Sequence, residues 1–328
     1  MVRIIGTGSY VPEKVLTNAD LERMVETSDE WIYERTGIRA RHIAAEDETT
    51  TDMALKASRR ALKRAGVRAE DLDLIIMGTV TGDVKMPASA AILQAKLGAG
   101  RATAFDVSAA CAGSIYALSI AEMFIRLDKA RVALVIGAEL LSRIVDWTDR
   151  NTCVLFGDAA GAMVLARSPG AEEEGRGILS THLHTDGQQA EILDIPGGGV
   201  ALPFSEEVMA KRQHFVRMNG REVFKHAVRH LVEVSREALA ANGLRPEQID
   251  HVVAHQANIR ILEAVLNRLG IPMEKAITNI ERVGNTSSAS LPMTLDEAAR
   301  DGRLQPGQLL LMMAIGAGLS WGGAVVRW

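Results

Sequence analysis

A segment from the first half of the chain recurs in the second half, and this repeat constrains the fold more than any other sequence feature. Residues 61–78, ALKRAGVRAEDLDLIIMG, align with residues 238–255, ALAANGLRPEQIDHVVAH, 177 positions later. A second, weaker match aligns residues 132–142 with residues 311–321 at an offset of 179. Because both matches keep the same order at nearly the same offset, duplication of one folding unit explains them better than chance recurrence of a helix–turn–strand pattern.

Two kinds of apolar pattern alternate along the chain. Short runs rich in Val, Ile and Leu are typical of buried strands, and they lie at residues 74–77, 132–136, 252–253 and 309–313. Alanine-rich stretches with apolar residues at helical spacing are typical of amphipathic helices, and they lie at residues 51–65, 114–127, 222–242 and 258–269. This alternation predicts an α/β fold with largely parallel sheets.

The repeat and the alternation together predict two duplicated halves. We place the N-terminal half at residues 1–170 and the C-terminal half at residues 171–328, because Pro, Gly and acidic residues at 168–175 are typical of an exposed connector. A second irregular stretch, residues 185–219, interrupts the C-terminal half early and is expected to form a lid or a channel wall.

Composition and charge exclude several classes of protein. The 328 residues include 41 acidic and 37 basic side chains, a net charge of −4, which argues against a strongly basic nucleic-acid-binding protein. Two cysteines cannot build a disulfide framework or a multi-cysteine zinc site, so we expect a reducing, cytoplasmic location and no bound metal. No apolar run reaches the ~18 residues of a membrane span, so no membrane association is expected.

Cys111 lies in a run of small residues between an expected strand at 102–107 and an expected helix from residue 114. A position near a helix N-terminus favours the thiolate, because unpaired N–H groups and the helix dipole stabilise negative charge there. A small buried cysteine that only packs a helix is the alternative interpretation. Cys153 lies in a strand-like pattern without these features and is interpreted as structural.

Two polar residues lie at expected turns in the C-terminal half. His255 follows the strand at 252–254, and α/β folds bind ligands at the carboxyl ends of their strands. Asn285 precedes another helix and, in chain order, holds the place in the second copy that Cys111 holds in the first. Pseudo-twofold symmetry would bring these turns together around one site. A satisfied core histidine and a helix-capping asparagine are the alternative interpretations.

Seven segments spread over the whole chain resemble the β-ketoacyl-acyl-carrier-protein synthase III family of the thiolase superfamily. They read IIGTGSYVPE, TSDEWIYERTGIRARHIA, FDVSAACAGSIYALS, FGDAAGA, HQANIRI, GNTSSAS and GAGLSWGGA. Related chain-elongating synthases use a Cys-His-His set, whereas Asn285 stands at the third position here. The resemblance implies a thiolase-like fold of two halves related by pseudo-twofold symmetry, with layers in the order α-β-α-β-α.

The resemblance also implies a condensing enzyme that starts type II fatty-acid synthesis. Cys111 would take the acyl group from acyl-CoA. His255 and Asn285 would stabilise the enolate formed when malonyl–acyl carrier protein loses CO2, and would not be needed for the first transfer. Backbone N–H groups of Cys111 and Ala317 would hold the oxyanion, at a position where the family usually has glycine instead of Ala317. No resident cofactor is implied.

Further residues match positions where the family binds its substrates. The contacts to CoA and pantetheine, an indole face for stacking and guanidinium groups for phosphates, match Trp31, Arg35 and Arg150. The residues expected to contact the acidic carrier protein are Lys225, Gln256 and Arg260. The acyl pocket is expected to be lined by Leu141, Phe156 and, from the second subunit of a homodimer, Met86.

Two other functions are open at this point. One is a related acyltransferase or ketosynthase of secondary metabolism that uses another acceptor. The other is an inactive scaffold of the same fold, and the intact set of Cys111, His255 and Asn285 argues against it.

Overall fold

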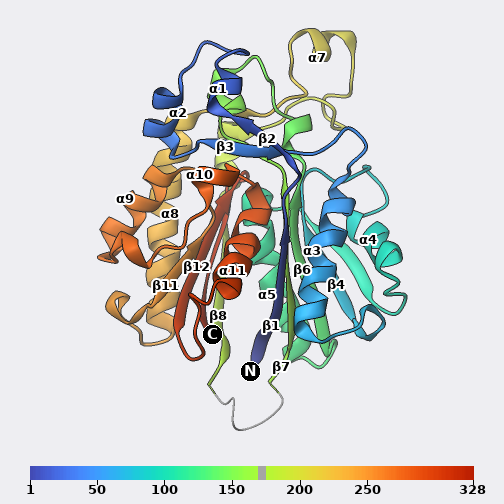
Figure 1. Ribbon diagram of the computed structural model, residues 1–328, viewed down its shortest axis with the longest axis vertical. Coiled ribbons are helices and arrows are strands. Elements are labelled where there is room, and N and C mark those ends of the chain that lie inside the picture. Colours follow the sequence, from blue (N-terminus) through green and yellow to red (C-terminus); the bar gives the residue numbers. More distant parts are fainter. Residues whose placement is uncertain (169–174) are drawn as a thin grey trace.

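Two β-sheets form the framework of the computed structural model, which describes residues 1–168 and 175–328 (Figure 1). The five-stranded sheet has the order β1 (Val2–Tyr10), β7 (Ala159–Arg167), β6 (Val132–Glu139), β4 (Leu74–Gly78), β5 (Thr103–Val107). The four-stranded sheet has the order β11 (His251–Ala254), β12 (Leu309–Gly316), β13 (Ser320–Arg327), β8 (Gly177–Thr185). Two short ribbons pair β2 (Lys14–Thr17) with β3 (Ala40–Ile43) and β9 (Leu193–Asp194) with β10 (Arg217–Met218).

The helices follow the predicted stretches closely. The larger ones are α2 (Asp29–Thr36), α3 (Thr50–Ala65), α4 (Ser89–Leu97), α5 (Gly113–Arg126), α8 (Gly220–Ala241), α9 (Ile259–Leu269) and α11 (Ser290–Arg300). Single-turn helices are α1 (Asn18–Leu21), α6 (Arg150–Cys153), α7 (Glu206–Ala210) and α10 (Ile280–Val283). Cys153 therefore ends a short helix and does not lie in a strand, so that detail of the sequence prediction is wrong.

The elements stack in five layers, as predicted. Helices α3 and α4 pack on the outer face of the five-stranded sheet, and α8 and α9 pack on the outer face of the four-stranded sheet (Figure 1). Helices α5 and α11 lie between the sheets, in one apolar core to which both sheets contribute. The order α-β-α-β-α of a thiolase-like fold is thereby confirmed.

The sheets are mixed, so the prediction of largely parallel sheets is wrong. Strand β4 runs parallel to β5 and β6, and β11 runs parallel to β12. The other neighbours, β1–β7, β6–β7, β12–β13 and β13–β8, are antiparallel. Residues 317–319, which join β12 to β13, are too few for the crossover that a parallel pair requires.

The predicted boundary between the halves falls at residues 169–174, which lie outside the described residues. The five-stranded sheet is built from residues 2–167 and the four-stranded sheet from residues 177–327. The irregular stretch at 185–219 contains only β9, β10, α7 and a 3₁₀ segment, and α7 projects from the body of the molecule (Figure 1). Among the described residues, no helix has both the length and the apolar character that crossing a membrane requires.

Candidate active site

Cys111 lies in a 3₁₀ turn, Ala110–Ala112, that leads from β5 into the buried helix α5. Its side chain is buried, with a relative exposure of 9%. The end of β12 packs directly against this turn, since a Cβ atom placed on Gly316 would lie 2.4 Å from the backbone nitrogen of Cys111. Glycine is therefore required where the second half of the chain approaches the cysteine.

The thiol of Cys111 is protonated at neutral pH in this structure. Burial raises its pKa to about 12, although a hydrogen bond with the Ser287 hydroxyl acts in the opposite direction, and the nearby Glu139 carboxyl raises the pKa further. The position at a helix N-terminus was expected to favour the thiolate, but burial outweighs it. A base must therefore take the thiol proton before the sulfur can attack a substrate.

His255 follows the carboxyl end of β11 and is neutral, because burial lowers its pKa to about 4. Its Nδ1 lies 2.7 Å from the Oγ of Ser290, and the Ser290 hydroxyl in turn donates to the carbonyl oxygen of Ser287 at 2.8 Å. Since a hydroxyl has one proton, Ser290 must accept from His255, and the imidazole proton is on Nδ1. The Nε2 atom of the neutral ring is therefore an acceptor.

Asn285 follows α10 and is fixed by its backbone and by its side-chain oxygen. Its N–H donates to the carbonyl of Leu155 at 2.8 Å, and its own carbonyl accepts from the N–H of Gly157 at 3.0 Å. The Oδ1 atom accepts from the N–H of Ser287 at 2.9 Å. The side-chain amide, Nδ2, is thus the group that Asn285 has left to offer a substrate oxygen.

The structure brings the three predicted residues to one cavity. Cys111, His255 and Asn285 all line a cavity of about 270 Å³, which also reaches Trp31 and Arg35. A second cavity of about 230 Å³ begins at Cys111 and is lined mainly by apolar side chains, including Ala317, with Asp194 and Ser287 as polar neighbours. A substrate arm and an acyl chain can therefore approach the same sulfur from two directions.

The pseudo-symmetric partner of Cys111 is Ser288, and not Asn285 as the sequence order predicted. Cys111 and Ser288 each occupy the middle of a 3₁₀ turn before a central helix. The residue before each has a left-handed backbone, with φ of 45° at Ala110 and 50° at Ser287. The repeat offset of 177 also pairs residue 111 with residue 288, so the sequence contained this signal.

Glu139, at the end of β6, is a buried residue of the site that sequence reasoning missed. Its Oε2 accepts from the Thr81 hydroxyl at 2.6 Å and from the Val80 N–H at 3.2 Å. Its Oε1 lies 3.3 Å and 3.1 Å from the hydroxyl oxygens of Ser287 and Ser288. One carboxyl thereby joins the loop after β4 to the turn that faces Cys111.

Replacing Glu139 by Gln is expected to change how stability depends on pH. Burial raises the pKa of Glu139 from 4.5 to about 7, so the folded protein holds this proton more tightly than the unfolded chain. Wild type should therefore lose stability relative to Glu139→Gln as pH rises from about 4.5 to 7, by roughly 3 kcal/mol in total. Urea unfolding of both proteins at pH 5 and pH 7.5 measures this difference, and parallel pH dependence would contradict it.

The predicted CoA contacts form a stack at the mouth of the larger cavity. The guanidinium carbons of Arg35 and Arg150 lie 4.5 Å and 4.7 Å from the centre of the Trp31 ring. Arg150 also donates to the backbone carbonyl of Glu26 at 2.8 Å. Both guanidinium groups therefore lie close to the ring on which an incoming aromatic base would stack.

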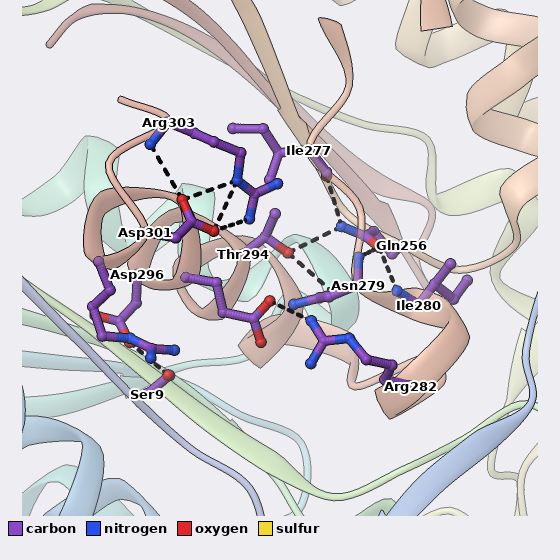
Figure 2. Close-up of polar contacts among 12 residues, drawn as sticks. Ser9, Gln256, Ile277, Asn279, Ile280, Arg282, Thr294, Asp296, Asp301 and Arg303 are labelled. Carbon is purple, nitrogen blue, oxygen red and sulfur yellow. Dashed lines mark hydrogen bonds and ion pairs between the residues drawn. The ribbon is translucent and has the colours of Figure 1, made fainter. Parts of the chain in front are cut away.

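The residues predicted to contact carrier protein divide into two kinds. Lys225 on α8 and Arg260 on α9 are exposed. Gln256, in contrast, is only 3% exposed and its side chain is bonded to buried groups (Figure 2). The structure therefore does not support a contact of Gln256 with carrier protein, because its side chain is buried and its amide is bonded inside the protein.

The acyl-pocket residues are separated within one chain. Leu141 and Phe156 line the smaller cavity beside Cys111. Met86, in contrast, is 86% exposed and is not among the residues that line it. A contribution of Met86 to an acyl pocket therefore requires a second copy of the chain.

Comparison with known proteins agrees with this geometry. The family model "3-Oxoacyl-[acyl-carrier-protein (ACP)] synthase III" matches residues 105–187, and its C-terminal counterpart matches residues 239–328. The curated β-ketoacyl-[acyl-carrier-protein] synthase III of Xanthomonas campestris is 54% identical, covering 99% of this chain and 98% of the relative. That of Rhodospirillum centenum is 53% identical over the same shares.

Among solved structures, the 3-oxoacyl-[acyl-carrier-protein] synthase III of Aquifex aeolicus superposes with a TM-score of 0.93 at 48% identity, with complete coverage of both chains. More than half of the residues are identical to those of the Xanthomonas campestris synthase over 99% of this chain. Cys111, His255 and Asn285 also line one cavity, as the family resemblance implied. The chain belongs to the β-ketoacyl-[acyl-carrier-protein] synthase III family.

Proposed function

We propose that this protein starts type II fatty-acid synthesis by condensing an acyl group from acyl-CoA with malonyl–acyl carrier protein. The observation that supports this most strongly is the meeting of Cys111, His255 and Asn285 in one cavity that is open toward Trp31. High identity to synthases of the same name over the full chain favours this function over a related secondary-metabolic acyltransferase. The chemistry needs no resident cofactor, and we propose a cytoplasmic location.

In the first step, Cys111 exchanges its proton for an acyl group. Nε2 of neutral His255 accepts the thiol proton while the sulfur attacks the acyl-CoA carbonyl carbon. Backbone N–H groups of Cys111 and Ala317 hold the oxyanion of the tetrahedral intermediate. The C–S bond to CoA then breaks, and the CoA sulfur takes the proton from Nε2. The acyl chain occupies the smaller cavity, and CoA leaves through the larger one.

In the second step, the malonyl carboxylate brings negative charge beside His255 and favours uptake of a proton at Nε2. Loss of CO2 leaves an enolate, whose oxygen accepts hydrogen bonds from Nε2–H of His255 and from Nδ2–H of Asn285. The enolate carbon attacks the Cys111 thioester, and the expelled thiolate takes the proton from His255. One proton is consumed in total, as the decarboxylative condensation requires.

We further propose that substrates approach past Trp31. The indole face stacks with the CoA adenine, while Arg35 and Arg150 bind its phosphates. Exposed Lys225 and Arg260 attract the acidic carrier protein. Each of these roles is a proposal that rests on the family resemblance and on the position of the side chain beside the cavity.

We also propose that the active form is a homodimer. Strand β5 is an outer strand of its sheet, so one side of its backbone has no neighbouring strand among the residues that the structure describes. The exposed Met86 precedes α4, which packs on β5. Pairing of two copies through this region would bring Met86 of one subunit to the acyl cavity of the other.

Substitution of Met86 is expected to change the choice of primer. Methionine is unbranched and flexible, so the pocket should accept short primers beyond acetyl, including propionyl and branched four- or five-carbon groups. Met86→Phe should narrow the preference toward acetyl, and Met86→Ala should admit longer chains. Because one methylene contributes about 1–3 kcal/mol of discrimination, preferences should shift by tens-fold. Values of kcat/KM for acyl-CoAs of two to eight carbons test this, and identical profiles would exclude Met86 from the pocket.

The experiment that tests the proposed function is intact-mass analysis in two stages. The protein is first incubated with a panel of acyl-CoAs, and malonyl–acyl carrier protein is then added. Acylation of Cys111 that disappears with release of CO2 supports the proposal. Acylation that persists after malonyl–acyl carrier protein is added would indicate an acyltransferase that uses another acceptor.

A further inference from the structure

Gln256, the residue after His255, is the centre of a buried hydrogen-bond cluster (Figure 2). Its Nε2 donates to the carbonyl oxygen of Ile277 and to the hydroxyl of Thr294, both at 3.0 Å. Its Oε1 accepts from the N–H groups of Asn279 and Ile280, both at 2.9 Å. Both amide protons and both oxygen lone pairs are therefore used inside the protein.

The bonds at Oε1 fix the segment that carries Asn285. Asn279 caps the N-terminus of α10 and Ile280 is its first residue, so their N–H groups have no acceptor within the helix. Gln256 supplies that acceptor. Helix α10 has a single turn and ends at Val283, and only its capping residue Gly284 separates it from Asn285. The position of the Asn285 amide therefore depends on how firmly Gln256 holds the start of this turn.

The bonds at Nε2 fix the segment that orients His255. Thr294 lies one turn of α11 beyond Ser290, which accepts the Nδ1 proton of His255. The Thr294 hydroxyl also donates to Oδ1 of Asn279 at 3.3 Å, which closes the cluster. His255 and Gln256, which follow one another after β11, are thus both bonded to α11, at Ser290 and at Thr294.

We propose that Gln256 is a positioning residue that sets the distance between the two enolate donors, Nε2 of His255 and Nδ2 of Asn285. The expected effect on decarboxylation rests on the proposed function. The expected effect on the position of residues 277–286 does not. Enolate stabilisation requires both donors to reach one oxygen, so a small displacement of either weakens it. In the proposed mechanism, acylation of Cys111 uses His255 as its base but does not use Asn285, and its oxyanion donors lie on other elements, at Cys111 and Ala317. Loss of Gln256 should therefore impair decarboxylation more than acylation.

Gln256→Glu tests this with little change of shape. The carboxylate still accepts from Asn279 and Ile280, but it cannot donate to the Ile277 carbonyl or the Thr294 hydroxyl. Thr294→Val removes two bonds of the same cluster, those of the hydroxyl with Gln256 and with Asn279, and serves if Gln256→Glu does not fold. Gln305→Glu, the same chemical change at an exposed glutamine after α11, is the matched control.

The kinetic measurement compares malonyl–acyl carrier protein with malonyl-CoA, which carries no protein. We expect Gln256→Glu to lower the rate of CO2 release about 10- to 100-fold with both substrates. The KM for malonyl–acyl carrier protein should stay within about twofold of wild type, and the rate of Cys111 acylation should fall clearly less than the rate of CO2 release. Thr294→Val should show a smaller loss in the same direction, and Gln305→Glu should show none.

Two kinetic outcomes overturn the proposal. A raised KM for malonyl–acyl carrier protein with unchanged use of malonyl-CoA would make Gln256 a docking contact. Equal losses of acylation and decarboxylation would make its role one of general stability.

A second measurement does not depend on activity. Amide hydrogen exchange in Gln256→Glu should accelerate in residues 277–286 and stay unchanged in residues 109–116, which surround Cys111. Unchanged exchange in residues 277–286 would overturn the proposal. If wild type itself releases no CO2, the proposed function fails, and the exchange result still decides what Gln256 holds in place.

Discussion

Cys111→Ser is expected to abolish formation of the acyl-enzyme. The base that we propose for the nucleophile's proton is Nε2 of His255, which lines the same cavity as Cys111, and burial holds the pKa of that imidazole at about 4. A base so weak can deprotonate a thiol during attack, but a serine hydroxyl is far less acidic. Transfer from acyl-CoA should therefore fall by about 10³-fold or more. Intact mass after incubation with acyl-CoA measures the labelled fraction directly.

The serine variant should otherwise keep the wild-type fold. Serine is slightly smaller than cysteine and fits the same 3₁₀ turn, so the thermal midpoint should change little. If the Cys111→Ser variant melts like wild type but forms no acyl-enzyme, the loss is due to the missing nucleophile and not to misfolding. Acylation of the variant at the wild-type rate would mean that another residue is the nucleophile.

Asn285→Ala is expected to separate the two half-reactions. Nδ2 of Asn285 is the donor offered to the enolate, and the thiol proton is taken by His255, so acylation should continue. Release of CO2 from malonyl–acyl carrier protein should fall by about 10²- to 10³-fold, the usual effect of removing one donor to a developing oxyanion. Mass analysis of the acyl-enzyme and a CO2 assay on the same sample give both numbers.

His255→Ala should impair both half-reactions, and here the structure changes the sequence prediction. In the proposed mechanism, His255 with its proton on Nδ1 first accepts the proton of Cys111 at Nε2 and only later donates from that atom. Slow acylation in His255→Ala together with normal acylation in Asn285→Ala would confirm that His255 acts already in the first half-reaction. Equal acylation in both variants would show that His255 serves the enolate alone.

Local patterns predicted most of the fold. Strands such as β4 and β6 and helices such as α3 and α5 have a strong apolar periodicity, so their bounds fall within a few residues of the prediction. Strand direction was predicted less well, because a run such as β7 has the same buried pattern whether its neighbours are parallel or antiparallel. Pairing depends on connections between strands, which apolar periodicity does not report.

The residues of the candidate site were likewise predicted only in part. Cys111, His255 and Asn285 were found because each follows a strand or precedes a helix within a recognisable motif. Glu139 was missed, because it ends an apolar strand and only the folded chain brings it to the Ser287 turn. Gln256 was expected to contact carrier protein from the family resemblance alone, whereas its burial and its four hydrogen bonds appear only in three dimensions.

The shared central layer has a consequence for how such a chain could arise and unfold. Leu118 of α5 and Leu295 of α11 are fully buried in one core with Leu74 from the first sheet and Val253 from the second. Either half alone would therefore expose a broad apolar face to water, at a cost of about 25 cal/mol per Å². A single unduplicated unit would need a second copy of itself to cover that face. We therefore expect the two halves to unfold together in one cooperative transition.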